Sequence, residues 1–415
     1  MIQIPENKFQ LSSADLFDEI VIKKSQESQT ANLLFFGDLV PTGKVGDTLS
    51  SNEPQKLINE IYPDLKNSDL NVINLEAPLT NCRTKLIKEG PVLVGKPDTI
   101  SGIKKIGFKV INLANNHILD MGEKGLLDTI EACNNNSILT VGAGKNINEA
   151  SAPLFLQIKN IRVGIIAVAE NEYSIAKQHA AGSAPINVIS NFKQVKFSID
   201  KSDVTIVLIH GGLEYYPVPR PGLVEYCRFL VDCGVNAVIC NHTHIPSAIE
   251  IYKESPIIYG MGNFLFDRKG KDIDWYHGYY TKLSISNNGV FSFQVKPYEQ
   301  CNGYIGIKAL NNNVNNRIIE QIYNASILLH DIESYRDQWE KTCAKLTDKY
   351  IIGLRSPIIF NGVGRLVKMF PFLKSLLLLP RKHALRVLNM IRCETHQEVL
   401  ETVLTLYIKS FKKIQ

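Results

Sequence analysis

The chain has 415 residues, a net charge of +5, 45% hydrophobic residues and 21% charged residues. This length and composition are ordinary for a folded α/β domain with an appendage. The charge is modest, and no basic run with interleaved aromatic residues occurs in the first 300 residues, so nucleic acid is not expected as a partner. The eight cysteines include no C-x-x-C pair, which favours reduced, buried thiols over a disulfide framework or a structural zinc site.

In chain order, short apolar segments typical of strands alternate with segments of helical periodicity. Such alternation indicates repeated β/α units and a parallel or mixed sheet covered on both faces. The predicted strands span residues 32–36, 69–75, 108–113, 139–141, 162–168, 204–209, 235–240 and 256–259, and the main helices residues 54–66, 122–135 and 221–234. An Asn-Gly turn between segments 279–286 and 290–295 predicts a β-hairpin.

Three regions follow from these patterns: a polar segment over residues 1–30, an α/β domain over 31–300 and a mostly helical extension over 301–415. Within the extension, an apolar stretch at 367–380 is followed by a predicted amphipathic helix that carries four basic residues, Arg381, Lys382, Arg386 and Arg392. Residues 366–392 are typical either of a packed helical subdomain or of a surface that binds a membrane or a partner protein.

The N-terminus, Met1 to Lys8, lacks the basic and then apolar pattern of a signal peptide, and no run of about eighteen apolar residues predicts a membrane-spanning helix. We therefore expect a cytoplasmic protein, peripheral to the membrane if the extension binds one.

Polar side chains follow the predicted strands at five places. In open α/β sheets the carboxyl ends of the strands form the crevice where ligands bind, so these side chains are expected to converge. Each has a plainer interpretation, as a turn residue, a helix cap or a satisfied core histidine, but their coincidence at five strand ends favours one shared site. They are Asp38, Glu76, Asn116 with His117, His210, and His242 with His244.

Two carboxylates, an amide oxygen and three imidazoles form a ligand set that suits Zn²⁺, Mn²⁺ or Fe better than Ca²⁺. The set exceeds the needs of one four-coordinate ion, and it would serve a two-metal centre with a bridging carboxylate that activates a water. In that arrangement His117, next to Asn116, remains available as a general acid.

Six short motifs occur in order along the chain. They are Gly37-Asp38, Asn74-Leu75-Glu76, Asn115-Asn116-His117 with Asp120 and Gly122, His210-Gly-Gly-Leu-Glu214-Tyr215, Asn241-His242-Thr243-His244-Ile245-Pro246, and Gly262-Asn263-Phe264. Together they resemble the CapA family of poly-γ-glutamate capsule proteins, a branch of the calcineurin-like metallophosphoesterases. The resemblance covers residues 31–300 and implies a four-layer α/β/β/α sandwich with a two-metal site.

The resemblance implies that Glu76 bridges two metal ions and that His117 is the proton donor. The first ion would be bound by Asp38 and His244, and the second by Asn116, His210 and His242. Contacts to substrate or to the ligands themselves are expected from Asn74, Asp120, Glu214, Arg220 and Asn263, with Arg220 as an anion contact between two prolines.

One position departs from the pattern, since the usual Asp-x-His of the first motif ends here in Val40. A valine cannot ligate a metal, so the first ion is expected to bind more weakly. The leading functional hypothesis is a metal-dependent hydrolase, with one or two divalent ions, that acts on a phosphoester or related bond in a surface polymer or a phosphorylated substrate. The alternative is a non-catalytic, metal-binding component that handles the polymer or assembles the capsule machinery, with residues 366–392 contacting a membrane or a partner.

Overall fold

The computed structural model describes residue 16 and residues 18–23, 29–310, 312–354 and 381–411. The chain divides into two compact units, one formed by Met1–Leu86 and Val92–Ile332, the other by Ile87–Pro91 and Glu333–Gln415. The apolar stretch predicted at 367–380 lies outside the described residues.

The first sheet of the larger unit is mixed. Four neighbouring strands that run to one edge are parallel: β2 (Ala31–Leu39), β3 (Leu70–Leu75), β4 (Val110–Asn112) and β5 (Leu139–Val141). On the other side of β2 lies the predicted hairpin, formed by β15 (His277–Ser286) and β16 (Gly289–Gln300). Three short strands extend this sheet: β14 (Asn263–Leu265) pairs with β2, and β1 (Ile20–Val21) and β17 (Ile307–Ala309) pair with β16.

The second sheet also has a parallel centre. Its four parallel strands are β8 (Ile161–Ala169), β10 (Val204–His210), β11 (Ala237–Asn241) and β13 (Ser255–Ile258). The edge strands β7 (Leu154–Ile158) and β12 (Ile249–Tyr252) run antiparallel to their neighbours. A separate small ladder joins β6 (Ala143–Gly144) to β9 (Gly182–Ser183).

The alternation of side chains along the strands produces two apolar layers, because successive residues of a strand point to opposite faces. Leu33 and Phe35 of β2 pack toward Val163 and Ile165 of β8, between the two sheets. The intervening Phe36 packs outward against helices on the other face of the first sheet. The four-layer α/β/β/α architecture predicted from the sequence is thereby confirmed.

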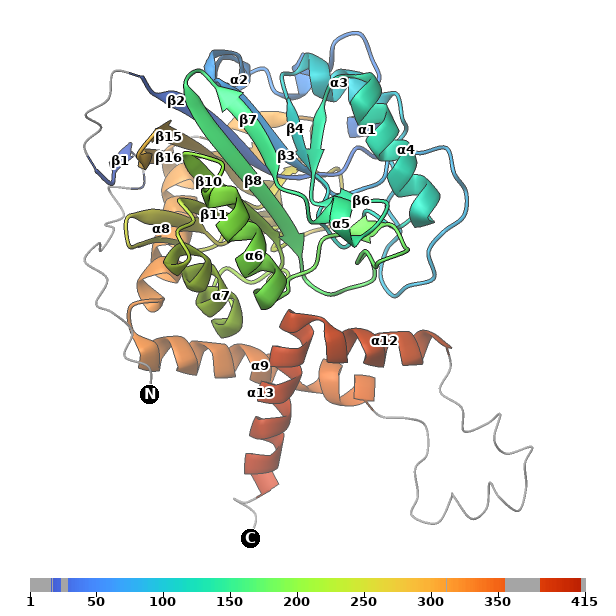
Figure 1. Ribbon diagram of the computed structural model, residues 1–415. Coiled ribbons are helices and arrows are strands. Elements are labelled where there is room, and N and C mark those ends of the chain that lie inside the picture. Colours follow the sequence, from blue (N-terminus) through green and yellow to red (C-terminus); the bar gives the residue numbers. More distant parts are fainter. Residues whose placement is uncertain (1–15, 17, 24–28, 311, 355–380, 412–415) are drawn as a thin grey trace. The chain divides into compact units, whose positions relative to one another are not determined.

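Helices cover the two outer faces (Figure 1). Those on the first sheet are α1 (Gly43–Leu49), α2 (Tyr62–Asn67), α3 (Thr99–Lys105) and α4 (Gly122–Asn135). Those on the second are α6 (Val188–Ile199) and α7 (Pro221–Asp232), while α5 (Ile147–Ala150) lies beside the small ladder. Helix α8 (Asn312–Leu328), which the sequence patterns grouped with the C-terminal extension, inserts Ile318, Ile319 and Ile322 into the core between the sheets.

The prediction of a single helix over residues 54–66 is wrong. The segment forms a 3₁₀ turn at Pro54–Leu57 and then the separate helix α2. Pro63 explains the break, because proline lacks the amide hydrogen that a helix interior requires and is tolerated only in the first turn. It lies in the first turn of α2.

The smaller unit contains α9 (Ile332–Leu354), α12 (Arg381–Arg392) and α13 (Glu394–Phe411). Trp339 of α9 donates a hydrogen bond of 3.1 Å from Nε1 to Thr402 Oγ1 of α13. In helix α12, which follows the predicted apolar stretch, Met390 is buried, whereas Leu388 and Ile391 are exposed. Within the described part of the chain, every helix is too short or too polar to cross a membrane.

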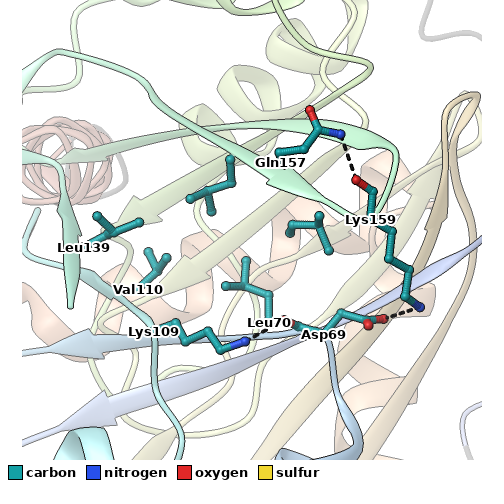
Figure 2. A pocket seen from close by; sticks show the side chains of 9 residues that line it. Asp69, Leu70, Lys109, Val110, Leu139, Gln157 and Lys159 are labelled. Carbon is teal, nitrogen blue, oxygen red and sulfur yellow. Dashed lines mark hydrogen bonds and ion pairs between the residues drawn. The ribbon is translucent and has the colours of Figure 1, made fainter. Parts of the chain in front are cut away.

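A cavity of about 260 Å³ opens where the parallel strands of the first sheet begin (Figure 2). Asp69 Oδ2 lies at its edge, 3.0 Å from Lys159 Nζ and 2.8 Å from the Asn32 amide, and Lys109 Nζ donates to the Asp69 carbonyl. These contacts satisfy the charged groups, and the cavity lies at the opposite end of the strands from the polar residues that the sequence singled out. Its lining consists of Asp69, Leu70, Lys109, Val110, Leu139, Leu156, Gln157, Ile158 and Lys159.

Candidate metal centre

The carboxyl ends of the parallel strands of both sheets lie close together, and there the predicted ligands converge. Two groups of side chains each have potential ligand atoms that lie within 4.8 Å of one another, and both groups are buried. The first consists of Asp38, Glu76 and His244, and the second of Glu76, His210 and His242. Glu76 belongs to both, which is the arrangement that a bridging carboxylate requires.

The surroundings of the Glu76 carboxylate show whether these residues suit a metal ion. Both of its carboxylate oxygens are buried, and no residue in the described part of the chain donates a hydrogen bond to either. Oε1 lies 3.5 Å from His210 Nε2, and Oε2 lies 3.9 Å from His244 Nδ1. Burial, followed by the charge of Asp38, raises the pKa of the Glu76 carboxyl to about 7. A buried carboxylate without donors demands a positive charge, and a divalent ion on each side would supply it.

Asp38 is held by a network of amides at the strand ends. Its Oδ1 accepts a hydrogen bond of 2.7 Å from Asn74 Nδ2, and its Oδ2 lies 3.4 Å from His244 Nδ1. Asn74 Oδ1 in turn accepts bonds from Asn112 and Asn115. The network fixes the orientation of Asp38, which is the role expected of groups that surround metal ligands.

The imidazole of His210 contacts three polar side chains. Its Nε2 is 3.0 Å from His242 Nδ1 and 3.1 Å from Asn116 Oδ1, and its Nδ1 is 3.3 Å from Asn74 Nδ2. Burial and the neighbouring His242 lower the pKa of His210 to about 3. His210 is therefore neutral at physiological pH, which is the form that ligates metals.

The His242-Thr243-His244 turn has unusual backbone geometry. His242 has φ 102° and His244 has φ 59°, although neither is glycine. Such conformations cost free energy and persist where the surrounding structure enforces them, often at functional sites. Here Asp38 Oδ2 accepts from the His242 amide at 3.3 Å, and Thr243 Oγ1 donates to the Ile245 carbonyl at 2.8 Å.

Asn263 supports the second histidine of the turn. Its Oδ1 is 2.9 Å from His244 Nδ1, while its Nδ2 donates to the carbonyl oxygens of His244 and Trp275, each at 3.2 Å. Asn263 is the first residue of β14. Burial alone would lower the pKa of His244, but Glu76 and Asp38 outweigh it and raise that pKa to about 10.

His117 and Asp120 form a buried pair beside the ligands. His117 Nδ1 lies 2.7 Å from Asp120 Oδ2, and the same oxygen accepts from the Leu93 amide at 2.7 Å. The other imidazole nitrogen, Nε2, faces Glu76 Oε1 at 4.0 Å. This geometry gives His117 a fixed orientation with one nitrogen directed at the ligand cluster.

Val40 fills the position at which the resemblance would place an imidazole. Its side chain is buried in a small apolar cluster with Phe266, Trp275 and Tyr276. Trp275 and Tyr276 belong to the 3₁₀ turn η3 (Ile273–Tyr276). One side of the candidate first metal site is thus an apolar wall.

Of the two remaining predicted residues, Arg220 is buried and Glu214 is exposed. Arg220 is buried at the start of α7, and its Nε and Nη2 donate to Glu170 Oε1 at 3.1 and 2.9 Å. The same oxygen accepts from the Gly212 amide at 3.1 Å, so the Arg220–Glu170 pair supports the loop that follows His210. Glu214 is exposed on that loop.

Burial alone would lower the pKa of His242, and the carboxylates of Glu214 and Glu172 outweigh it, so the pKa rises. Glu172 Oε1 lies 3.9 Å from His242 Nε2. The sequence interpretation missed Glu170 and Glu172. The signal was present, because Glu170 directly follows β8 in the same way that Glu76 follows β3.

Comparisons with known proteins agree with the motifs. The profile of a family described as "Bacterial capsule synthesis protein PGA_cap" matches residues 32–268, more than half of the chain. The chain is 29% identical over 254 residues to the "Capsule biosynthesis protein CapA" of Bacillus anthracis, a match that spans 59% of this chain and 62% of that relative. It is 24% identical over 286 residues to the "PGA biosynthesis protein CapA" of Bacillus subtilis strain 168, spanning 66% of this chain and 73% of the relative.

Two solved structures show only a distant likeness. A phosphatase of Mycoplasma pneumoniae has a TM-score of 0.41 at 15% identity, with coverage of 65% of this chain and 93% of the other. A 5'-nucleotidase of Candida albicans has a TM-score of 0.38 at 9% identity, with coverage of 73% and 57%. On the evidence of the matched family profile, the chain belongs to the PGA_cap family of bacterial capsule synthesis proteins.

Proposed function

We propose that this PGA_cap protein is a metal-dependent hydrolase of capsule polymer biosynthesis. The observation that carries the proposal is Glu76, whose two buried oxygens lack hydrogen-bond donors in the described structure and lie between two sets of ligand atoms. The names of the two Bacillus relatives supply the biosynthetic setting.

The residues that would hold the ions follow from the two groups. Asp38 and His244 would bind one ion, His210 and His242 the other, and Glu76 both; Asn116 Oδ1, which faces His210, would join the second set. Imidazole, carboxylate and amide ligands suit Mn²⁺, Zn²⁺ or Fe. When bound, such ions activate a water and offset the negative charge that develops on the substrate.

His117 is proposed as the general acid. Hydrolysis of a phosphoester breaks the bond between phosphorus and the leaving oxygen, and that oxygen must gain a proton. His117 Nε2, directed toward the ligand cluster, would donate it, while Asp120 holds Nδ1 and stabilises the imidazolium before the transfer. The proton released by the attacking water returns the imidazole to its starting form.

The proposed substrate is a surface polymer or a phosphorylated precursor of one, and the reacting bond is a phosphoester or a related acyl bond. A second candidate function is a non-catalytic component that binds metal and handles the polymer. Val40 favours this candidate, because it removes an imidazole from the first ion and leaves an apolar contact there.

Elemental analysis of the purified protein, combined with a hydrolysis assay, tests the proposal. We expect bound Mn, Zn or Fe in the wild type and less in His242→Ala and Glu76→Gln, together with metal-dependent turnover of bis(4-nitrophenyl) phosphate. A protein that neither retains metal after loading nor hydrolyses any ester would refute the hydrolase. Normal metal content without turnover, and capsule production unaffected by His117→Ala, would establish the non-catalytic alternative.

A further inference from the structure

An aromatic wall stands beside the candidate metal centre. Tyr215, on the loop after His210, and Trp275 pack against each other and against the His244 ring. The ring centroids are 5.0 Å apart for His244 and Trp275, 5.8 Å for Tyr215 and Trp275, and 5.9 Å for Tyr215 and His244. One face of this wall therefore contacts a proposed metal ligand.

Lys271 lies over the same wall. Its Nζ is 4.6 Å from the centroid of the Trp275 ring, 4.7 Å from that of Tyr215 and 3.3 Å from the Tyr215 hydroxyl oxygen. Aromatic faces attract a cation and hold it without neutralising its charge. The two aromatic rings that Lys271 contacts are therefore the same two that contact His244.

The ammonium of Lys271 forms no ion pair with the residues that the structure describes. Among the described residues no carboxylate lies within ion-pair distance of Lys271 or of the exposed Arg268, whereas Lys253 and Lys159 pair with Asp232 and Asp69. Burial and the nearby Arg268 lower the pKa of Lys271, and the carboxylates of Glu214 and Asp272 offset only part of this effect. A partly buried ammonium that feels a second cation is in an environment that a bound anion would stabilise.

The loop that carries these cations is held in place. Tyr276 donates from its hydroxyl to the Arg268 carbonyl at 3.1 Å. Gln300 closes the base of the loop, because its Oε1 accepts from the Phe266 amide at 2.9 Å and its Nε2 donates to the Trp275 carbonyl at 3.2 Å. Preorganised groups lose less conformational entropy when they bind a ligand.

We propose that Lys271 and Arg268, on the wall formed by Tyr215 and Trp275, bind an anionic group of the substrate next to the bond at the metal centre. The group is a carboxylate or a phosphate, so the substrate carries negative charge beyond the reacting bond, as a polyanionic chain does. The location of the reacting bond rests on the proposed function, whereas anion binding by these residues does not.

Calorimetric titration of the full-length, metal-loaded protein tests the anion site directly, with tri-glutamate as the carboxylate probe and tripolyphosphate as the phosphate probe. Lys271→Ala should raise the Kd of the matching probe about five- to tenfold and reduce its dependence on salt. Lys271→Arg should restore most of the affinity. Lys269→Ala, which removes an exposed lysine of the same loop, is the matched control and should leave the Kd unchanged.

The probe whose Kd depends on Lys271 identifies the group: a carboxylate, a phosphate, or both. If neither Kd changes in Lys271→Ala while circular dichroism shows a native fold, the proposal is overturned. A turnover experiment adds the link to chemistry, by comparing an aryl phosphodiester that carries a carboxylate with its methyl ester. Lys271→Ala should lower the ratio of their kcat/KM values about five- to tenfold. Absence of turnover with both esters would contradict the proposed hydrolase, while the titrations would still decide the anion site.

Discussion

Replacing Glu76 with glutamine should stabilise the metal-free protein and destabilise the metal-loaded one. In the absence of metal, the wild-type carboxylate is buried without a hydrogen-bond donor from the described residues. Glutamine has nearly the same shape and carries no charge, so it avoids the cost of burying the anion. When metal is added, the carboxylate becomes the shared ligand and the preference reverses.

The pKa shift of Glu76 gives the size of the expected change in the free energy of unfolding. Folding raises it from 4.5 to about 7, so the native protein binds the proton more tightly than the unfolded chain does. The stability of the metal-free protein therefore falls as pH rises from about 4.5 to about 7, and levels off above that range. At about 1.4 kcal/mol per pKa unit the loss is on the order of 3 kcal/mol. Glu76→Gln should recover most of it at pH 8 and little of it near pH 4.5.

Urea denaturation of both proteins at pH 5 and pH 8, in chelator and again with saturating Mn²⁺ or Zn²⁺, measures the effect. Glu250→Gln is the matched control, because Glu250 is equally buried but bonded by Arg228 at 2.6 and 3.0 Å and by the Tyr259 hydroxyl at 2.9 Å. It should destabilise the protein with or without metal. The reasoning fails if Glu76→Gln is less stable than the wild type in chelator at pH 8.

Three further changes have defined outcomes. His117→Ala should lower the kcat of metal-dependent ester hydrolysis about 10²- to 10⁴-fold and leave the metal content unchanged. If metal is lost in parallel, His117 is a metal ligand and not the general acid. Asn263→Ala removes the hydrogen bonds from Asn263 Nδ2 to the carbonyl oxygens of His244 and Trp275, so it should weaken binding of one metal equivalent about 10- to 100-fold in a calorimetric titration. An unchanged affinity would show that Asn263 does not position His244. Arg220→Met should lower the free energy of unfolding, measured by urea denaturation, by about 3 to 5 kcal/mol, because the buried Glu170 carboxylate loses the positive charge of Arg220. A cost below about 1 kcal/mol would mean that the pair is effectively solvated.

The sequence predicted the candidate ligands best, because one rule about parallel sheets places them. Parallel strands end at a common edge, so polar residues after apolar runs identified Asp38, Glu76, His210 and His242 without knowledge of the fold. The same rule would have found Glu170, had the strand been extended by one residue to Ala169. Likewise, the position of Pro63 already indicated that a helix over 54–66 would break.

Other features depended on contacts that no local pattern encodes. Trp275, in a 3₁₀ turn 31 residues after His244, contacts the His244 ring, and Gln300 links Phe266 and Trp275 at the two ends of the loop that carries Lys271. Val40 was recognisable as a missing ligand, but its packing in an apolar cluster follows from the tertiary structure alone. Such pairings between distant segments are set by the fold, and periodicity says nothing about them.

The positive φ angles of the histidine turn have a consequence for anyone who diversifies this loop by saturation mutagenesis. At φ 102° a glycine replaces His242 without backbone strain, whereas valine or isoleucine would combine that strain with β-branching. A screen for thermostability in chelator should therefore enrich glycine at position 242, while a screen for metal retention should eliminate it. The two selections would rank the same library in opposite orders, so a variant chosen for robustness alone would have lost the ligand for which the strained turn exists.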